Sequence, residues 1–187
     1  MRTAIRTWWL VALFGLEIAS AFLYFRNAGV GFHRQATIIL LGRLVLATGA
    51  CAIAAALRTH PRNWPLALNG FAFAVLGLAF NGVFGFRISF REISLLILIT
   101  ALSMAAVEWR ERRVLRRAEA TAPVILYDTA TFLLLLFGVV FAVISVTGLH
   151  TAQGRNPELL LLGSYFVLSA VSVLVLIWGA LKLKSAT

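Results

Sequence analysis

Apolar residues fill six long stretches of this 187-residue chain, and charged residues fall mostly between them. A helix needs about 20 residues to cross the ~30 Å hydrocarbon layer of a bilayer, and each stretch reaches or approaches that length. The pattern therefore predicts an all-α polytopic membrane protein with six transmembrane helices. The expected helices cover roughly residues 7–25, 36–57, 64–86, 90–109, 122–149 and 157–181.

Short connections between the stretches predict that consecutive helices are antiparallel neighbours. The segment beginning at Trp9 aligns with the one beginning at Trp64 and, more weakly, with the one beginning at Pro123. This repeat predicts one domain, 1–187, built from three tandem helical hairpins over approximately 7–57, 64–109 and 122–181. All three hairpins start from the same side, which makes them parallel repeats and not the inverted repeats of many transporters.

The second apolar stretch is unusually rich in glycine and alanine between Gly42 and Ala56. Small side chains allow helix backbones to approach closely inside a membrane. We therefore expect this helix to pack tightly against its neighbours.

Composition agrees with a membrane protein, because 61% of the residues are hydrophobic and only 13% are charged. The net charge of +10 reflects topology and does not indicate a nucleic-acid partner. Eleven lysines and arginines fall on the side that holds both termini, and five fall on the other side. Since basic residues concentrate on the cytoplasmic side of membrane proteins, we expect both termini to lie in the cytoplasm.

Three segments carry a resemblance to a known family: Leu40-Leu41-Gly42, the run from Thr48 to Arg58, and the run from Asn63 to Gly70. They form a small-residue helix ending in Ala-Ala-Leu-Arg, a short basic loop, and a Trp-led helix with a polar-Gly pair. In this pattern the chain, over about residues 8–184, resembles the HdeD-like family of bacterial inner-membrane proteins. The resemblance implies an inner-membrane protein linked to acid resistance and general stress response. The chain departs from the family at Ala79–Gly82, which lacks a proline, and in its long loop over Arg110–Arg117.

Two charged residues fall inside the first predicted hairpin, Glu17 in its first helix and Arg43 in its second. At ~1.5 Å per residue both lie in the middle third of the bilayer, within reach of each other. Intramembrane charges are costly and usually have partners. We therefore expect Glu17 to pair with Arg43, either as a structural ion pair or as part of a proton or ion path; separate solvation is the alternative.

Asp128 is a third intramembrane polar candidate, and it occupies the same position in the repeat as Asn69. Both fall about five residues inside the predicted cytoplasmic boundary. We expect them to form hydrogen bonds between helices or to line a cytoplasmic vestibule.

A basic run follows the fourth apolar stretch, where it forms the predicted fourth loop. Basic side chains at this depth can contact anionic lipid headgroups as well as set topology. The run contains Arg110, Arg112, Arg113, Arg116 and Arg117.

The sequence contains no recognisable catalytic motif, phosphate-binding loop or metal-ligand cluster, so we expect no enzyme activity and no cofactor. The leading hypothesis is a non-enzymatic membrane protein of envelope or acid-stress response that acts through the bilayer or through protein partners, including another copy of itself. One alternative is a small channel or a proton or solute transporter that uses Glu17, Arg43 and Asp128. Another is an accessory subunit of a larger membrane complex.

Overall fold

The computed structural model of this chain describes residues 7–28, 35–59, 62–82, 90–117, 121–147 and 157–185. These residues form six helices, and no strand occurs among them, so the predicted all-α polytopic fold is confirmed. The helices are α1 (Thr7–Ala28), α2 (Gln35–Leu57), α3 (Trp64–Phe80), α4 (Phe90–Arg117), α5 (Thr121–Thr147) and α6 (Pro157–Ser185).

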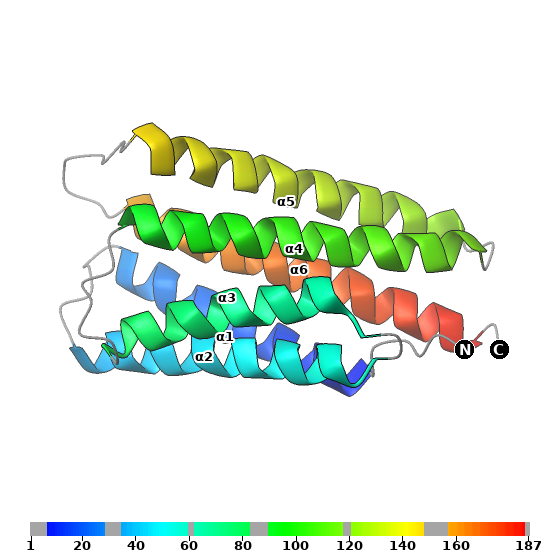
Figure 1. Ribbon diagram of the computed structural model, residues 1–187, viewed down its shortest axis with the longest axis horizontal. Helices are drawn as coiled ribbons and strands as arrows, with labels where there is room; N and C mark the ends of the chain where they lie inside the picture. The colour runs from blue at the N-terminus through cyan, green and yellow to red at the C-terminus, as the bar shows by residue number, and fades with distance from the viewer. Residues whose placement is uncertain are drawn as a thin grey trace.

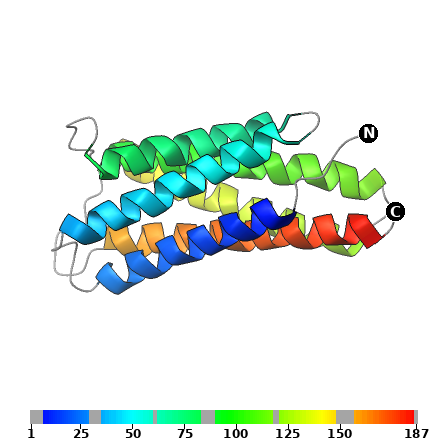
Figure 2. The ribbon, with the colours of Figure 1, turned by 90° about the horizontal axis from the view of Figure 1, so that it is seen from below.

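The helices lie side by side in one bundle, and α1 begins at the same end of the bundle where α6 ends (Figures 1 and 2). The most extensive contacts join α1 with α6, α2 with α3, and α4 with α5. Smaller contacts join α1 with α2, α3 with α4, and α5 with α6, so the helices close into a ring; α4 touches α6 across it. The most extensive helix contacts therefore join different predicted hairpins, and the contacts within each predicted hairpin are smaller.

Facing glycines explain why α2 and α3 approach so closely. Gly42 lies against Gly77, and Gly49 lies against Gly70. A Cβ atom placed on Gly49 would sit 2.5 Å from the carbonyl oxygen of Gly70, and one on Gly77 would sit 2.5 Å from the backbone nitrogen of Leu46. In each helix the two glycines are two turns apart and thus share a face. The close packing predicted from the small residues is confirmed at this interface.

The third helix is shorter than the sequence pattern predicts, because it ends at Phe80 and not near residue 86. Its first turn is capped by Asn63, whose side chain accepts a hydrogen bond from the Leu66 backbone nitrogen at 3.3 Å. At its other end Gly82 has a φ of 67°, a left-handed conformation that stops a helix and favours glycine. Seventeen residues span ~25 Å, less than the hydrocarbon layer. Each of the other five helices contains a stretch long and apolar enough to cross a membrane.

The fourth helix is longer than predicted and continues through Arg117. The basic run Arg110–Arg117 is therefore the last two turns of α4, and the prediction of a loop there is wrong. Arginine, glutamate and leucine are good helix formers, and this run contains neither glycine nor proline to end the helix.

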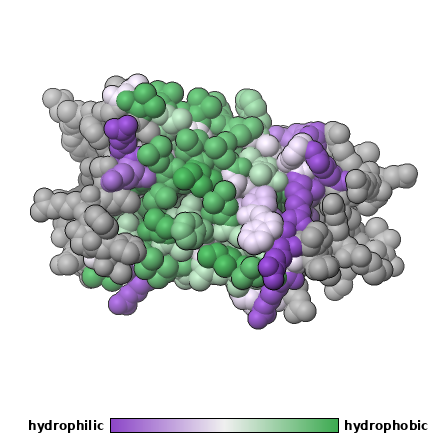
Figure 3. Space-filling model, in the orientation of Figure 1, coloured by the Kyte–Doolittle hydropathy of each residue, from purple (hydrophilic) through white to green (hydrophobic). Residues whose placement is uncertain are grey.

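On the face shown in Figure 3, apolar side chains cover the middle of the bundle, and hydrophilic residues lie toward its two ends. Phe71 is 62% exposed and Phe132 is 65% exposed, which a water-facing surface would not tolerate over such an area. Inside the bundle, large aromatic rings fill the centre, with Tyr24 stacked on Phe166 at 5.4 Å between ring centres. This exposed apolar surface fits the membrane-like architecture of the five long apolar helices.

Candidate functional site: a polar centre inside the bundle

Glu17 lies in the core of the bundle with none of its surface exposed. Its Oε1 atom accepts a hydrogen bond from the Ser169 hydroxyl of α6 at 2.9 Å. Its Oε2 atom has no hydrogen-bond partner among the described residues. The carboxyl group thus belongs to the extensive contact between α1 and α6, at a depth where a polar group needs an internal partner.

The predicted pairing of Glu17 with Arg43 is wrong, because Arg43 is exposed on the outside of α2. The reason lies in the way α2 packs on α3. Gly42 faces α3 at close range, and each further residue is rotated by about 100° around the helix. Arg43 is turned away from the core by this packing, and its long side chain can reach toward the headgroups along the bundle surface.

A second polar group joins three helices through Thr100 of α4. The Tyr165 hydroxyl of α6 donates to the Thr100 Oγ1 atom at 2.6 Å, and the Asn69 side-chain nitrogen of α3 donates to the Thr100 carbonyl oxygen at 3.1 Å. All three side chains are buried. Asn69 therefore makes a hydrogen bond between helices inside the bundle, as its position in the sequence predicts.

Asp128 does not share this environment, although the repeat aligns it with Asn69. It is 45% exposed at its side chain and forms an ion pair with Arg112, with 2.7 Å between Oδ2 and Nη2. The preceding residue, Tyr127, takes the buried position of this turn, so Asp128 is rotated outward. The expected hydrogen bond inside the bundle is replaced by a surface ion pair that the two extra turns of α4 make possible.

The sequence analysis missed Glu108, a second fully buried carboxyl group. Its Oε2 atom accepts a hydrogen bond from the Thr131 hydroxyl of α5 at 2.8 Å, and its Oε1 atom has no partner within the described part of the chain. A signal was present, because Glu108 falls inside the predicted helix over residues 90–109, where a carboxyl group is an intramembrane charge. In the structure it continues a buried stripe at helical spacing that contains Ile93, Ile97, Ala101 and Met104.

Basic side chains collect at the end of the bundle where α2 and α4 end and α3 begins. The Arg110 guanidinium donates to the carbonyl oxygen of Arg62 at 3.0 Å, which ties α4 to the α2–α3 connection. The Arg113 guanidinium lies 3.6 Å from the centre of the Trp109 ring. The side chains of Arg116 and Arg117 lie outside the described part of the structure.

These side chains hold two carboxyl groups and several hydroxyl groups inside an apolar bundle, which suits helix-to-helix recognition or proton exchange. No group of three histidine, cysteine, aspartate or glutamate side chains that could hold a metal ion occurs within the described ranges. Comparison with known protein families, with characterised proteins and with solved structures finds no match for this chain.

Proposed function

We propose that this chain is a non-enzymatic integral membrane protein of the bacterial inner membrane that serves in envelope and acid-stress response. It acts through the surrounding bilayer or through protein partners. The observation that supports this proposal is the closed polar centre. Glu17, Asn69 and Tyr165 are buried, and each forms a hydrogen bond with a residue of a helix other than its own. The acid-stress context comes from the resemblance to the HdeD-like family.

A closed polar centre supports a structural scaffold role over a channel or transporter. Many transporters bind their substrates where membrane helices are broken near the middle of the bilayer. Here the five long helices run without interruption across their apolar stretches. Within these five helices, the described residues offer no break in the backbone at which a solute could bind.

In this proposal the end of the bundle that carries Arg58, Arg62, Arg110 and Arg113 faces the cytoplasm, together with both termini. The orientation is supported by the excess of basic residues on that side of the sequence. Trp64 and Trp109 lie at the same end with more than half of their surface exposed, as suits indole rings at the headgroup level.

Acid survival of a strain that lacks the protein tests the proposal, with the wild-type chain and a Glu17→Gln variant supplied from a plasmid. Glutamine keeps an acceptor for Ser169 and removes the titratable carboxyl group. On the scaffold reading, both proteins restore survival to the same level. Failure of the wild-type chain to change survival would refute the stress-response proposal.

Proton or solute transport is the second candidate, and the two buried carboxyl groups favour it. Buried carboxyl groups are the usual elements of intramembrane proton relays. The path would use Glu17 and Glu108, since Arg43 and Asp128 both lie on the surface. Proton flux into vesicles that contain the purified protein, lost in Glu17→Gln with folding intact, would promote this candidate over the scaffold.

An accessory role in a larger membrane complex is the third candidate. The outer face of α5 favours it, because Ile125, Phe132, Val139 and Val146 recur at every seventh residue and are all more than half exposed. A seven-residue repeat is the spacing at which two helices pack along a seam. Purification under mild conditions that yields one defined partner protein would support this role.

A further inference from the structure

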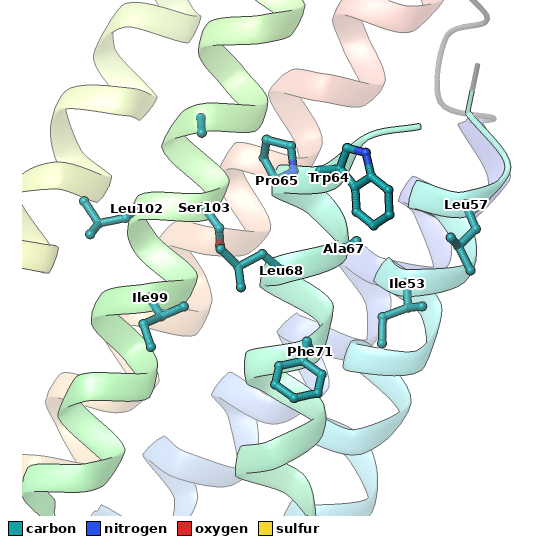
Figure 4. A pocket seen from close by; sticks show the side chains of 11 residues that line it. Ile53, Leu57, Trp64, Pro65, Ala67, Leu68, Phe71, Ile99, Leu102 and Ser103 are labelled. Carbon is teal, nitrogen blue, oxygen red and sulfur yellow. The ribbon is translucent and has the colours of Figure 1, made fainter. Parts of the chain in front are cut away.

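An apolar groove runs along the outside of α3, between the last turns of α2 and the middle of α4 (Figure 4). The hydroxyl group in its lining belongs to Ser103 and already donates to the Thr100 carbonyl oxygen at 3.0 Å. The groove therefore offers contacts to hydrocarbon and no free hydroxyl group to a polar ligand. Two of the buried oxygen atoms that lack partners among the described residues lie instead in the contact of α4 with α5 and α6.

These two oxygen atoms belong to Glu108 of α4 and Ser172 of α6, and both side chains are fully buried. The Thr131 hydroxyl of α5 donates to the Glu108 Oε2 atom at 2.8 Å, which leaves the Oε1 atom without a partner in the described part of the chain. Ser172 approaches the same carboxyl group from α6, but its hydroxyl forms no direct hydrogen bond with any described residue. The two oxygen atoms thus lie near each other, just beyond the reach of a direct bond.

The arrangement of the helices explains why the direct bond is not formed. The contact of α4 with α6 crosses the ring of the bundle and is the least extensive of the helix contacts. A serine side chain is short and does not bridge this separation. A hydroxyl group and a carboxyl oxygen that are buried away from bulk water each need a partner, because an unpaired polar atom in an apolar interior is costly.

The surroundings of the two atoms favour a small polar ligand. Met104 of α4, Leu134 of α5 and Leu176 of α6 lie one turn away on the same helix faces, and all three are buried. A buried water molecule needs two to four polar partners, which the carboxyl oxygen and the hydroxyl group begin to supply. Metal cations that prefer oxygen take about six or more ligands, more than these side chains provide.

We propose that one water molecule binds in this contact and bridges the Glu108 Oε1 atom to the Ser172 hydroxyl. The water donates one hydrogen bond to the carboxyl oxygen and forms a second bond with the hydroxyl group, which can either donate or accept. Arg112 lies one turn closer to the basic end of α4, and its side chain is 24% exposed. The site is therefore one helical turn from the surface, and water enters it from the basic end.

The bound water joins two polar contacts of the bundle into one row. Ser169 and Ser172 are three residues apart and lie on the same face of α6. Ser169 donates to Glu17, and Ser172 is linked to Glu108 through the water. The inference goes beyond the proposed function, because it assigns a ligand to the inside of the bundle. In the scaffold role the water strengthens the contact of α4 with α6, and in the proton-transport candidate it is the exchange partner of Glu108.

A structure of the purified protein at a resolution that shows ordered water tests the site directly. We expect a density peak within about 2.7–3.2 Å of both the Glu108 Oε1 atom and the Ser172 Oγ atom. In the Ser172→Ala variant this peak should lose roughly half or more of its occupancy, because one of its two partners is removed. Ser20→Ala is the matched control. Ser20 is also fully buried, but its hydroxyl donates to the Leu16 carbonyl oxygen of its own helix, so the peak should stay unchanged.

Thermal unfolding in detergent measures the same bridge in solution. Ser172→Ala should lower the melting temperature by roughly 2–4 °C, since it removes one hydrogen bond of the bridge. Ser20→Ala should not lower it, because a serine hydroxyl bonded four residues back along its own helix adds little stability. In a Glu108→Met background, which lacks the carboxyl partner, Ser172→Ala should cause no further loss. The density measurement needs no Glu108 variant and stays decisive if that variant does not fold.

Three results would overturn the inference. A direct bond between Glu108 and Ser172, with no peak between them, would show that α4 and α6 lie closer than the bridge requires. A wild-type melting temperature that rises with sodium chloride but not with choline chloride would identify a metal cation as the ligand. An equal loss from Ser172→Ala with and without the Glu108→Met change would show that the two residues are not linked. None of these outcomes depends on acid survival, so the water site and the stress-response proposal fail or succeed separately.

Discussion

Replacing Gly49 with alanine should push α2 and α3 apart, whereas the same replacement at Gly15 should disturb nothing. A Cβ atom on Gly49 would lie 2.5 Å from the Gly70 carbonyl oxygen and 2.6 Å from the Ala74 backbone nitrogen. A Cβ atom on Gly15 has no neighbouring atom within 4 Å. Both glycines lie within long apolar helices, so the two variants differ chiefly in this contact.

The size of the effect follows from how far the added Cβ atom would overlap with the backbone of α3. Ordinary contact begins at 3.4 Å, so α3 must move away by roughly 0.9 Å. A gap of about 0.5–1 Å forfeits a quarter to a half of the dispersion energy of each contact. Overpacking typically costs ~1–3 kcal/mol, and we expect the upper end because the obstructing atoms are backbone atoms that no rotamer change can move.

Alanine also gains ~1 kcal/mol over glycine from helix propensity at either position. Gly49→Ala should therefore lose ~2 kcal/mol and Gly15→Ala should gain ~1 kcal/mol, a difference of ~3 kcal/mol in the free energy of unfolding. For a chain of this length the difference corresponds to roughly 6–12 °C in melting temperature.

Thermal unfolding in detergent, followed by the loss of helical circular dichroism, measures this difference directly. The two variants are compared with the wild-type protein in the same detergent at the same concentration. A Gly49→Ala protein that melts at or above the temperature of Gly15→Ala would refute the close approach of α2 and α3.

Three further predictions concern the charged residues. Glu17→Gln and Arg43→Gln should change the free energy of unfolding additively, because the two side chains do not meet; a coupling above ~0.5 kcal/mol in the double-mutant cycle would contradict the structure. Asp128→Asn should lower the free energy of unfolding by at most ~1 kcal/mol, because the ion pair with Arg112 is exposed. This loss should become smaller as salt is added, and a loss that does not depend on salt would contradict the ion pair. A cysteine placed at Arg113 should resist a membrane-impermeant thiol reagent in intact cells and react after permeabilisation, and labelling from outside would reverse the proposed orientation.

Local pattern was sufficient for the class of the protein and for most of its helices. Apolar length alone predicts the six helices, because a bilayer requires a continuous apolar stretch with its backbone hydrogen bonds satisfied internally. The predicted helix ends differ from the observed ends where local residue preferences compete with hydropathy. Gly82 ends α3 early through its backbone conformation, and the helix-forming residues before Arg117 extend α4 beyond the apolar stretch.

The sequence could not determine which face of each helix turns inward. In a soluble protein the polar face of a helix marks the outside, but lipid is as apolar as the core of a membrane bundle, so this contrast is weak here. The partner of Glu17 is thus Ser169, more than 150 residues further along the chain, and not Arg43 in the neighbouring helix.

The tertiary packing determines which polar residue meets Glu17. The glycine faces of α2 and α3 pack against each other, so that side of α2 is buried and Arg43 lies on the outside. The same rotation around α5 places Tyr127 inward and Asp128 outward, although the repeat aligns Asp128 with the buried Asn69. The sequence by itself therefore determined that these polar residues lie in a membrane bundle. Only the packing of helix against helix decided which of them face the core, because a single helical step of about 100° separates the inside from the lipid.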